Sequence, residues 1–138
     1  DIEATDYYRD ALAFTRLNSL LNTGVEPVVR HLDWRQLPAD LEPVPLVLAS
    51  DVLYERPYAA AVAEVLSRLL VDEGRAIVAD PGRMAVADFL AECTARGLAL
   101  IGSEQHDFRA GEIRQTITLY SLAPSASSSR DFTSSPQR

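Results

Sequence analysis

Two short apolar runs, each followed by an acidic residue, are the feature that most constrains the fold of this chain. Residues 46–49 read Leu-Val-Leu-Ala and precede Ser50 and Asp51, and residues 76–79 read Ala-Ile-Val-Ala and precede Asp80. Unbroken apolar runs of this length are typical of strands buried on both faces, as in parallel sheets covered by helices. We therefore expect two buried strands in a mostly parallel α/β sheet.

A helix is predicted between these two strands, over residues 57–71. Its apolar residues recur at helical spacing and are Val62, Val65, Leu66, Leu69 and Leu70. This spacing makes one apolar face. Strand, helix and strand in this order form a crossover unit that joins two parallel strands.

The N-terminal residues predict a second unit of the same kind. Strands are expected over residues 1–5 and 27–32, with a helix over residues 7–23 between them. The apolar stripe of this helix consists of Ala13, Leu17, Leu20 and Leu21. Gly24 follows the stripe, where a left-handed helix end favours glycine.

The C-terminal residues predict a helix, a hairpin and a tail. The helix covers residues 84–96, and strands that start at 98–101 and span 113–122 follow it, with Gly111 in the turn between them. This pattern predicts an antiparallel hairpin at a sheet edge. Residues 123–138 hold six serines and two prolines, so we expect a domain over residues 1–122 and a disordered Ser-rich tail.

Length and composition limit the possible functions. The 138 residues suit a single domain. The net charge of -7 argues against a nucleic-acid partner, because phosphate binding needs a basic surface. A single cysteine and no paired Cys/His spacing give no support for a metal site. No apolar run approaches the roughly 18–20 residues of a membrane span, and no signal peptide is evident, so we expect a cytoplasmic protein without a membrane partner.

Ligands of open α/β sheets bind at the carboxyl ends of the strands, so we examined the residues that follow each predicted strand. Asp6 follows the first strand, where a carboxylate can accept hydrogen bonds from the hydroxyls of a ribose or can cap the next helix. Asp33 and Trp34 follow the second strand. They can contact a purine through its amine and its ring face, or the tryptophan can be part of the core.

Asp51 and Tyr54 follow the strand over residues 46–49. A carboxylate and a phenol at this place can hold and orient a cationic amine. The same residues can also be a helix-entry acid and a half-buried tyrosine. The segment Asp80–Arg83 can be a rim loop of the site or only a turn.

Several of these segments together resemble a known family. They are Ala4–Tyr7, Asn18, Asp33–Trp34, Leu46–Glu55 and Ala79–Arg83. Their order and spacing resemble the class I (seven-strand) S-adenosylmethionine-dependent methyltransferases. Asp51 and Tyr54 match the D-x-x-Y element of the branch that contains protein lysine methyltransferases. The Asp-Pro-Gly-Arg stretch is similar to the lysine methyltransferase of the electron-transfer flavoprotein β-subunit, and the resemblance covers residues 1–122.

The resemblance implies a Rossmann-like fold, S-adenosylmethionine as cofactor, and N-methylation of a lysine side chain in a protein substrate. The cofactor-binding positions that it implies are Asp6, Tyr7, Asp33, Trp34, Ala49 and Ser50. Asp6 would bind the ribose hydroxyls, and Asp33 would contact the adenine together with Trp34. Asp51 and Tyr54 would face the methyl-accepting amine. A small amine is the alternative acceptor.

One family feature has no counterpart here, because the sequence contains no G-x-G loop. By the resemblance, residue 1 lies at the family's second strand, so we expect the first strand and the glycine-rich loop to be lacking. The sheet would then be interrupted between the strands near residues 1–5 and 44–50, and activity would need the missing N-terminal segment. A small-molecule N-methyltransferase of the same fold and a non-catalytic fragment or binding module remain as alternatives.

Overall fold

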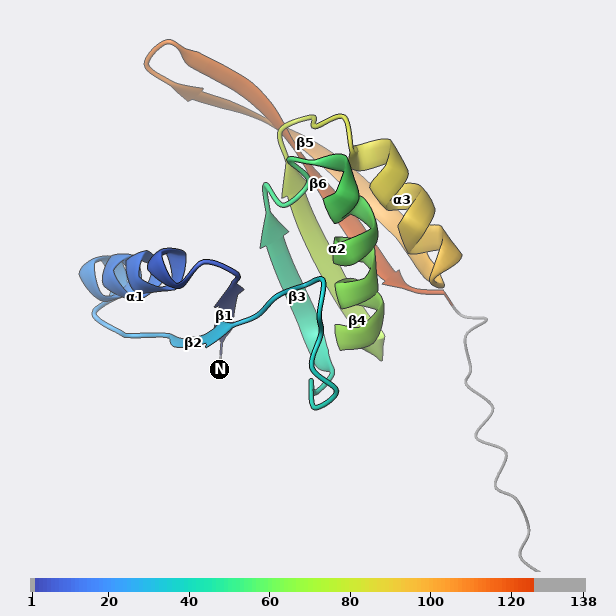
Figure 1. The fold of residues 1–138 in the computed structure, drawn as a ribbon. Coiled ribbons are helices and arrows are strands. Elements are labelled where there is room, and N and C mark those ends of the chain that lie inside the picture. Colours follow the sequence, from blue (N-terminus) through green and yellow to red (C-terminus); the bar gives the residue numbers. More distant parts are fainter. Residues whose placement is uncertain (1, 126–138) are drawn as a thin grey trace, which may run out of the picture. The chain divides into compact units, whose positions relative to one another are not determined.

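The computed structural model describes residues 2–125, which form helices α1–α3 and strands β1–β6 (Figure 1). The chain divides into two compact units, one of residues 1–40 and one of the residues that follow. The prediction of one partial domain over residues 1–122 stays a prediction, and each unit is described by itself. None of the helices within residues 2–125 is long and apolar enough to cross a membrane.

The N-terminal unit consists of β1 (Glu3–Asp6), α1 (Arg9–Thr23) and β2 (Val28–His31). The two strands pair in parallel, with Asp6 opposite His31. Helix α1 ends at Gly24, which has a φ of 74° and donates its N–H to the carbonyl oxygen of Leu20 at 2.9 Å. The predicted strand–helix–strand order and the glycine at the helix end are confirmed.

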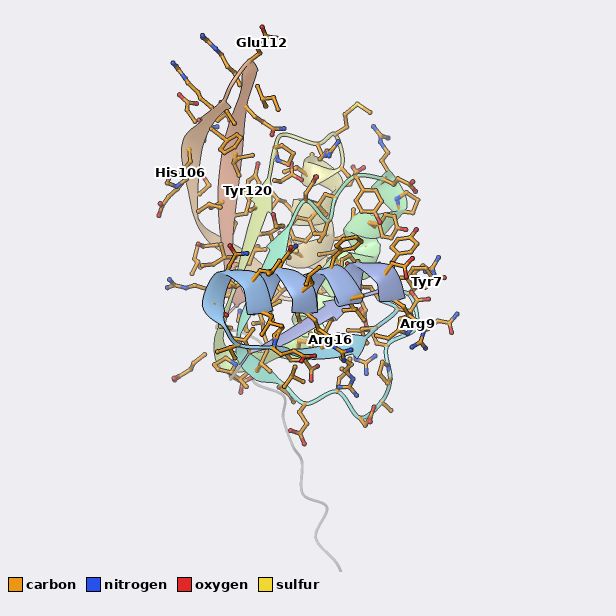
Figure 2. All side chains as sticks on the ribbon, turned by 90° about the vertical axis from the view of Figure 1, so that its left-hand side faces the viewer. Tyr7, Arg9, Arg16, His106, Glu112 and Tyr120 are labelled. Atoms are coloured by element: carbon orange, nitrogen blue, oxygen red, sulfur yellow. The ribbon has the colours of Figure 1, made fainter. Side chains whose placement is uncertain are left out.

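Helix α1 buries little of its predicted apolar stripe. Leu12, which precedes the stripe, is the buried residue of the helix, at 7% exposure. Leu17 and Leu20 are each 49% exposed and Leu21 is 73% exposed. Figure 2 shows the side chains of this helix, with Arg9 and Arg16 labelled. The sequence period therefore identified the helix correctly, but the stripe is not a packed face.

The C-terminal unit consists of β3 (Val44–Ser50), α2 (Arg56–Leu69), β4 (Leu70–Asp80), α3 (Val86–Ala95), β5 (Leu98–Ala110) and β6 (Ile113–Pro124). Its sheet has the order β3-β4-β6-β5, with β3 parallel to β4 and β6 antiparallel to both of its neighbours. Helices α2 and α3 cover the same face of this sheet (Figure 1). The predicted α/β fold with an antiparallel C-terminal hairpin is confirmed.

The core of this unit lies between the two helices and the sheet. The predicted apolar face of α2 is buried, with Val62 at 3% and Leu66 at 1% exposure. Phe89 of α3 and Val78 of β4 are both fully buried. Packing of these side chains holds the ends of β3 and β4 in place, and those ends carry the candidate site.

The prediction that the run over residues 46–49 is buried on both faces was wrong. Leu46 is 50% exposed and Leu48 is 68% exposed, whereas Val47 and Ala49 on the opposite face are half-buried. The reason is that β3 lies at the edge of its sheet and that α2 and α3 cover one face only. An apolar run shows that a strand can be buried, but the run does not show what covers it.

A bulge explains why β4 is longer than the predicted strand over residues 76–79. The pairing with β3 changes register between Val44 and Leu46, where residues 71–74 bulge opposite Pro45. Proline suits this place because it has no N–H to give to a ladder. A Cβ on Gly74 would lie 2.9 Å from a backbone oxygen. The helix predicted over residues 57–71 therefore ends at Leu69, and the residues that follow belong to the bulged start of β4.

The hairpin of β5 and β6 extends well past the rest of its sheet (Figure 1). Asp80 at the end of β4 pairs with Thr118, and the outer part of the hairpin, residues 106–117, continues beyond that pair. Gly111 makes the turn with a φ of 59°, and Glu112 lies at the tip (Figure 2). The hairpin thus projects from the same end of the sheet at which β3 and β4 end.

The last described strand runs past residue 122, where the domain was predicted to end. Strand β6 continues to Pro124, and the N–H of Ser125 donates to the carbonyl oxygen of Gly97 at 2.8 Å. Residues 126–138 of the predicted tail lie outside the described residues.

Candidate functional site

Asp51 sits where β3 ends and has an unusual backbone conformation. Its N–H donates to the carbonyl oxygen of Ala79 at 2.9 Å, which prolongs the parallel ladder by one step. Its φ is 51°, in the left-handed region that residues other than glycine rarely adopt. Strained residues of this kind concentrate at functional sites. The strain therefore marks Asp51 as a candidate independently of its charge.

Arg83 holds the carboxylate of Asp51 through two hydrogen bonds. Its Nε donates to Oδ1 and its Nη2 to Oδ2, each at 2.9 Å. The two side chains remain 50% (Asp51) and 44% (Arg83) exposed. These hydrogen bonds raise the pKa of Arg83 above its usual value. The pair joins residues 32 positions apart in sequence, so it depends on the pairing of β3 with β4.

Asp80 is the buried acid of this site. It is 0% exposed, and its Oδ1 accepts the N–H of Gly82 at 2.8 Å and that of Arg83 at 2.7 Å. Its Oδ2 has no hydrogen-bond partner among the described residues. Gly82 has a φ of 91°, which suits glycine. The segment Asp80–Arg83, for which a rim loop and a simple turn were both considered, forms a turn, and Asp80 shapes this turn that carries Arg83.

The segment Asp51–Tyr54 has two buried residues in the middle and an exposed residue at each end. Val52 is 9% and Leu53 is 1% exposed, whereas Tyr54 is 47% exposed. The ring of Tyr54 lies 4.7 Å from the ring of Tyr58, measured between centroids. The two buried residues anchor the segment, and the carboxylate and the phenol remain accessible on either side. Asp51 and Tyr54 thus lie together in one short segment, directly before α2.

Ala49 and Ser50, the two other predicted residues of this unit, are the last residues of β3. They pair with Val78 and Ala79 of β4. Ala49 is half-buried and Ser50 is exposed. Both therefore belong to the same strand end as Asp51.

The N-terminal unit carries the other predicted residues. Oδ1 of Asp6 accepts the N–H of Tyr8 at 2.7 Å. Tyr8 is the N-cap of α1 and makes no side-chain cap of its own. Asp6 therefore shapes the turn into the helix from two positions before the N-cap, which differs from the simple capping role that we considered. This contact uses one of its two carboxylate oxygens.

Tyr7, Asp33 and Trp34 follow the ends of β1 and β2, and Arg35 contacts two of them. The Nε and Nη2 of Arg35 donate to Oδ1 and Oδ2 of Asp33 at 2.8 and 2.9 Å, which lowers the pKa of Asp33. The guanidinium carbon of Arg35 lies 4.7 Å from the centroid of the Tyr7 ring. Trp34 is half-buried. Asp33 and Tyr7 therefore lie close together around one arginine.

Sequence reasoning placed Asp6, Tyr7, Asp33, Trp34, Ala49, Ser50, Asp51 and Tyr54 at strand ends, and the structure agrees with that placement. The first four belong to the N-terminal unit and the last four to the C-terminal unit. Asp80 and Arg83 were not among the predicted site residues. The sequence did hold a signal for them. Asp80 comes directly after an apolar run, much as Asp51 does, and Pro-Gly-Arg follows it. Within residues 2–125, no three His, Cys, Asp or Glu side chains gather as a metal-binding group.

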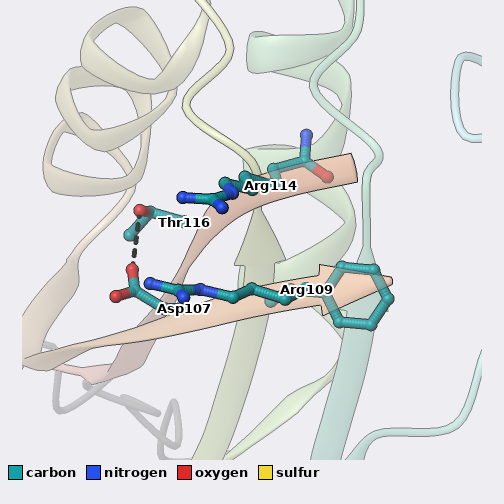
Figure 3. Close-up of a pocket in the computed structure, with 6 residues that line it drawn as sticks. Asp107, Arg109, Arg114 and Thr116 are labelled. Atoms are coloured by element: carbon teal, nitrogen blue, oxygen red, sulfur yellow. Dashed lines mark hydrogen bonds between the residues drawn. The ribbon is translucent and has the colours of Figure 1, made fainter. Parts of the chain in front are cut away.

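The tip of the β5–β6 hairpin has a shallow hollow of about 180 Å³. Arg109 and Arg114 face each other across the two strands, and Thr116 donates a hydrogen bond to Asp107 at 3.0 Å (Figure 3). Like charges directly opposite each other destabilise a strand pair. The hollow is lined by charged and polar side chains and Phe108, but it is small beside ordinary ligand pockets.

No protein-family model matches this sequence, and no curated protein matches it. Solved structures do match its fold. A ribosomal protein L11 methylase of Lactobacillus delbrueckii subsp. bulgaricus matches with a TM-score of 0.65 at 15% identity, over 91% of this chain and 58% of that one. The magnesium protoporphyrin IX methyltransferase of Synechocystis, solved with bound S-adenosylmethionine, matches with a TM-score of 0.64 at 17% identity, over 88% of this chain and 58% of that one.

An N-methyltransferase of Bradyrhizobium japonicum also matches, with a TM-score of 0.65 at 13% identity, over 89% of this chain and 72% of that one. The chain thus spans less than two thirds of the first two proteins. At these identities the likeness concerns the fold. The chain has the Rossmann-like α/β fold of the class I S-adenosylmethionine-dependent methyltransferases.

Proposed function

We propose that this chain is part of an S-adenosylmethionine-dependent methyltransferase that methylates an amine nitrogen, with a protein lysine side chain as acceptor. The observation that carries the proposal is the segment Asp51–Tyr54 at the end of β3. Its two central residues are buried while its carboxylate and its phenol are half-exposed. This arrangement, on a methyltransferase fold, supplies two polar groups that can orient an amine.

The N-terminal unit fits a nucleoside in part. Asp6 uses one carboxylate oxygen for the turn into α1, which leaves the other to accept a hydrogen bond from a ribose hydroxyl. Asp33 fits less well, because it accepts three hydrogen bonds from Arg35, one of them from the backbone N–H, and its side chain is only 22% exposed. We therefore propose Asp6, Tyr7 and Trp34 as the nucleoside contacts of the N-terminal unit, with Asp33 as a support for Arg35. In the C-terminal unit, Ala49 and Ser50 remain the proposed cofactor-binding residues.

When bound, the cofactor supplies an electrophilic methyl group on a sulfonium. The residues of this chain then need to position the acceptor and exclude water, since an in-line displacement requires close alignment. A lysine amine has a reference pKa of about 10.4 and must lose its proton before it can attack. Asp51 and Tyr54 would align the nitrogen through hydrogen bonds. Asp51 binds and orients in this proposal and is not the catalytic base.

We also propose that a segment preceding these residues completes the sheet and supplies a glycine-rich loop. The strands form two separate sheets, and Leu46 and Leu48 expose an apolar face of β3. A strand added to the edge of β3 would supply partners for its open backbone groups. The longer matching structures, of which this chain spans 58%, are consistent with this proposal.

The test is methyl transfer from labelled S-adenosylmethionine into a lysate, with the 138-residue chain and with a version extended upstream. These 138 residues contain no lysine, so lysine-bound label in the protein fraction must come from another protein or from the added segment. Label in the macromolecular fraction as methyl-lysine supports the proposal. Label confined to dialysable amines would instead identify a small-molecule N-methyltransferase.

Three variants divide the roles within this assay. Asp6→Ala should weaken the cofactor-dependent change in Trp34 fluorescence. Asp51→Asn and Tyr54→Phe should lower methyl transfer and leave the cofactor affinity largely unchanged. If neither form of the protein responds to S-adenosylmethionine, the chain is a binding module or an inactive fragment. If Asp51→Asn abolishes cofactor binding, the division of roles is wrong.

A further inference from the structure

We propose that Arg83 is a positioning residue that offsets the charge of Asp51, so that the pair receives the substrate nitrogen as a neutral amine. The inference rests on the function proposed above and adds a residue to it. Its basis is the two-bond contact between the guanidinium and the carboxylate, with both distances at 2.9 Å.

A carboxylate alone would hinder the reaction that it is meant to assist. A nearby negative charge favours the protonated form of an amine, and a protonated amine has no lone pair with which to attack the methyl group. A guanidinium bound to the same carboxylate opposes this effect, because a like charge disfavours the ammonium ion. Asp51 can then orient the nitrogen with a smaller preference for its protonated form.

The geometry leaves Asp51 able to accept further hydrogen bonds. A carboxylate offers about four acceptor positions, and Arg83 uses one on each oxygen. Half of the Asp51 side chain is exposed, at 50%. An amine N–H can therefore reach a free position of Asp51 without displacing the arginine.

The turn that carries Arg83 is fixed from within the fold. The fully buried Asp80 accepts the backbone N–H of Arg83 at 2.7 Å and that of Gly82 at 2.8 Å. Asp51 is held in its left-handed conformation with its own N–H bonded to β4. Both partners of the pair thus start from backbones set by the paired strands.

The other charged and titratable groups near the pair come from three neighbouring parts of the same unit. Asp80, the last residue of β4, is fully buried, so an incoming amine meets the exposed pair and not this acid. Tyr54 and Glu55 lie in the loop before α2, and Tyr58 lies on its first turn. Arg56, the first residue of that helix, has Asp88 at 3.9 Å.

The first test measures binding and does not need catalysis. The probe is n-butylammonium, and the readout is the carboxyl ¹³C signal of Asp51 in the full chain. Arg83→Gln should bind the probe roughly two- to five-fold more tightly than the wild type, the range of one exposed charge interaction. Arg83→Lys should stay near the wild type. Arg96→Gln is the matched control, since Arg96 pairs with Glu64 and Glu92 in the same unit.

The second test measures methyl transfer against pH in the active form of the protein. Arg83→Gln should move the acidic limb of kcat to higher pH by roughly half a unit, because kcat reports the protonation of the bound amine, and Arg83→Lys should restore it. Unchanged probe affinity in Arg83→Gln, or an equal change in Arg96→Gln, overturns the inference. Tighter probe binding in a protein that never transfers methyl supports the role of Arg83 and refutes the proposed function instead.

Discussion

The two units of this molecule have similar secondary structure but differ greatly in what they bury. In the N-terminal unit, the described residues bury two large apolar side chains, Leu12 and Leu32. In the C-terminal unit, both helices and three strands contribute to one core, which includes Phe89, Leu66 and Leu122. Helix α1 is as long as α2, with 15 residues against 14. Helix formation and helix packing are therefore separate properties of this sequence.

The difference has an energetic consequence. An isolated helix of this length is marginal in water, and so is a two-stranded sheet. The N-terminal unit consists of one such helix and one such sheet, with little packing between side chains of residues 2–40. In the C-terminal unit, a core joins the helices to the sheet. We expect the first unit to open far more readily than the second, and the following experiments test this in order of decreasing effect.

Amide hydrogen exchange should separate the two units most clearly. Amides in the middle of β4 and α2 should exchange about 100-fold more slowly, or slower still, than those of α1, because local opening costs less free energy where little is buried. The comparison uses intrinsic rates to correct for sequence. Equal protection in α1 and α2 would show that the N-terminal unit is stabilised by packing that its own residues do not provide.

Truncation of a core residue should destabilise only the C-terminal unit. Phe89→Ala should lower the free energy of unfolding by about 3–5 kcal/mol, since this side chain is fully buried. Leu17→Ala in α1 is the control and should change it by less than about 0.5 kcal/mol, because Leu17 is 49% exposed.

The single thiol of the chain provides the readout for this comparison. Burial raises the pKa of Cys93 to about 12, so the folded protein offers almost no thiolate at neutral pH. Thiol labelling in increasing urea should therefore follow the unfolding of the C-terminal unit, and Phe89→Ala should move its midpoint to lower urea. A midpoint unchanged by Phe89→Ala would contradict the packing argument.

Substitution of Gly82, in the turn after β4, should have an intermediate effect on the free energy of unfolding. Gly82→Ala should destabilise the C-terminal unit by about 1 kcal/mol, since its φ is 91° and a Cβ there meets no other atom within 4 Å. The matched control is Gly102→Ala, where a Cβ also meets no atom within 4 Å and the φ is not positive. Equal effects of both substitutions would show that the backbone angle is not the cause.

The smallest effect concerns the ion pair of the N-terminal unit. The pKa of Asp33 lies below its ordinary value of 3.8 because Arg35 donates hydrogen bonds to it. The stabilisation from this pair is therefore present above the unfolded-state pKa and is lost as the pH falls through the folded-state pKa. A ¹³C titration of the Asp33 carboxyl should show a higher midpoint in Arg35→Gln than in the wild type. An identical midpoint would rule out Arg35 as the cause.

Features that depend on nearby residues could be predicted from the sequence, whereas features that depend on contacts between distant residues could not. The helices and the hairpin depend on nearby residues and regular spacing. The contact between Asp51 and Arg83 depends on how β3 pairs with β4. The exposure of Leu46 and Leu48 depends on what covers the sheet. Neither could be derived from a local pattern, and the left-handed conformation of Asp51 has no sequence signal at all.

The projecting hairpin also has a consequence for strand pairing between copies of this chain. Beyond the Asp80–Thr118 pair, β6 loses its neighbour β4, so both outer edges of the ribbon present open backbone N–H and C=O groups. Such edges are templates for strand pairing and aggregation. Charged side chains lie on both outer strands, with Arg109 opposite Arg114 and Asp107 nearby. A second ribbon that paired edge to edge would bring these arginines together, so the charges that weaken the tip also disfavour pairing between copies.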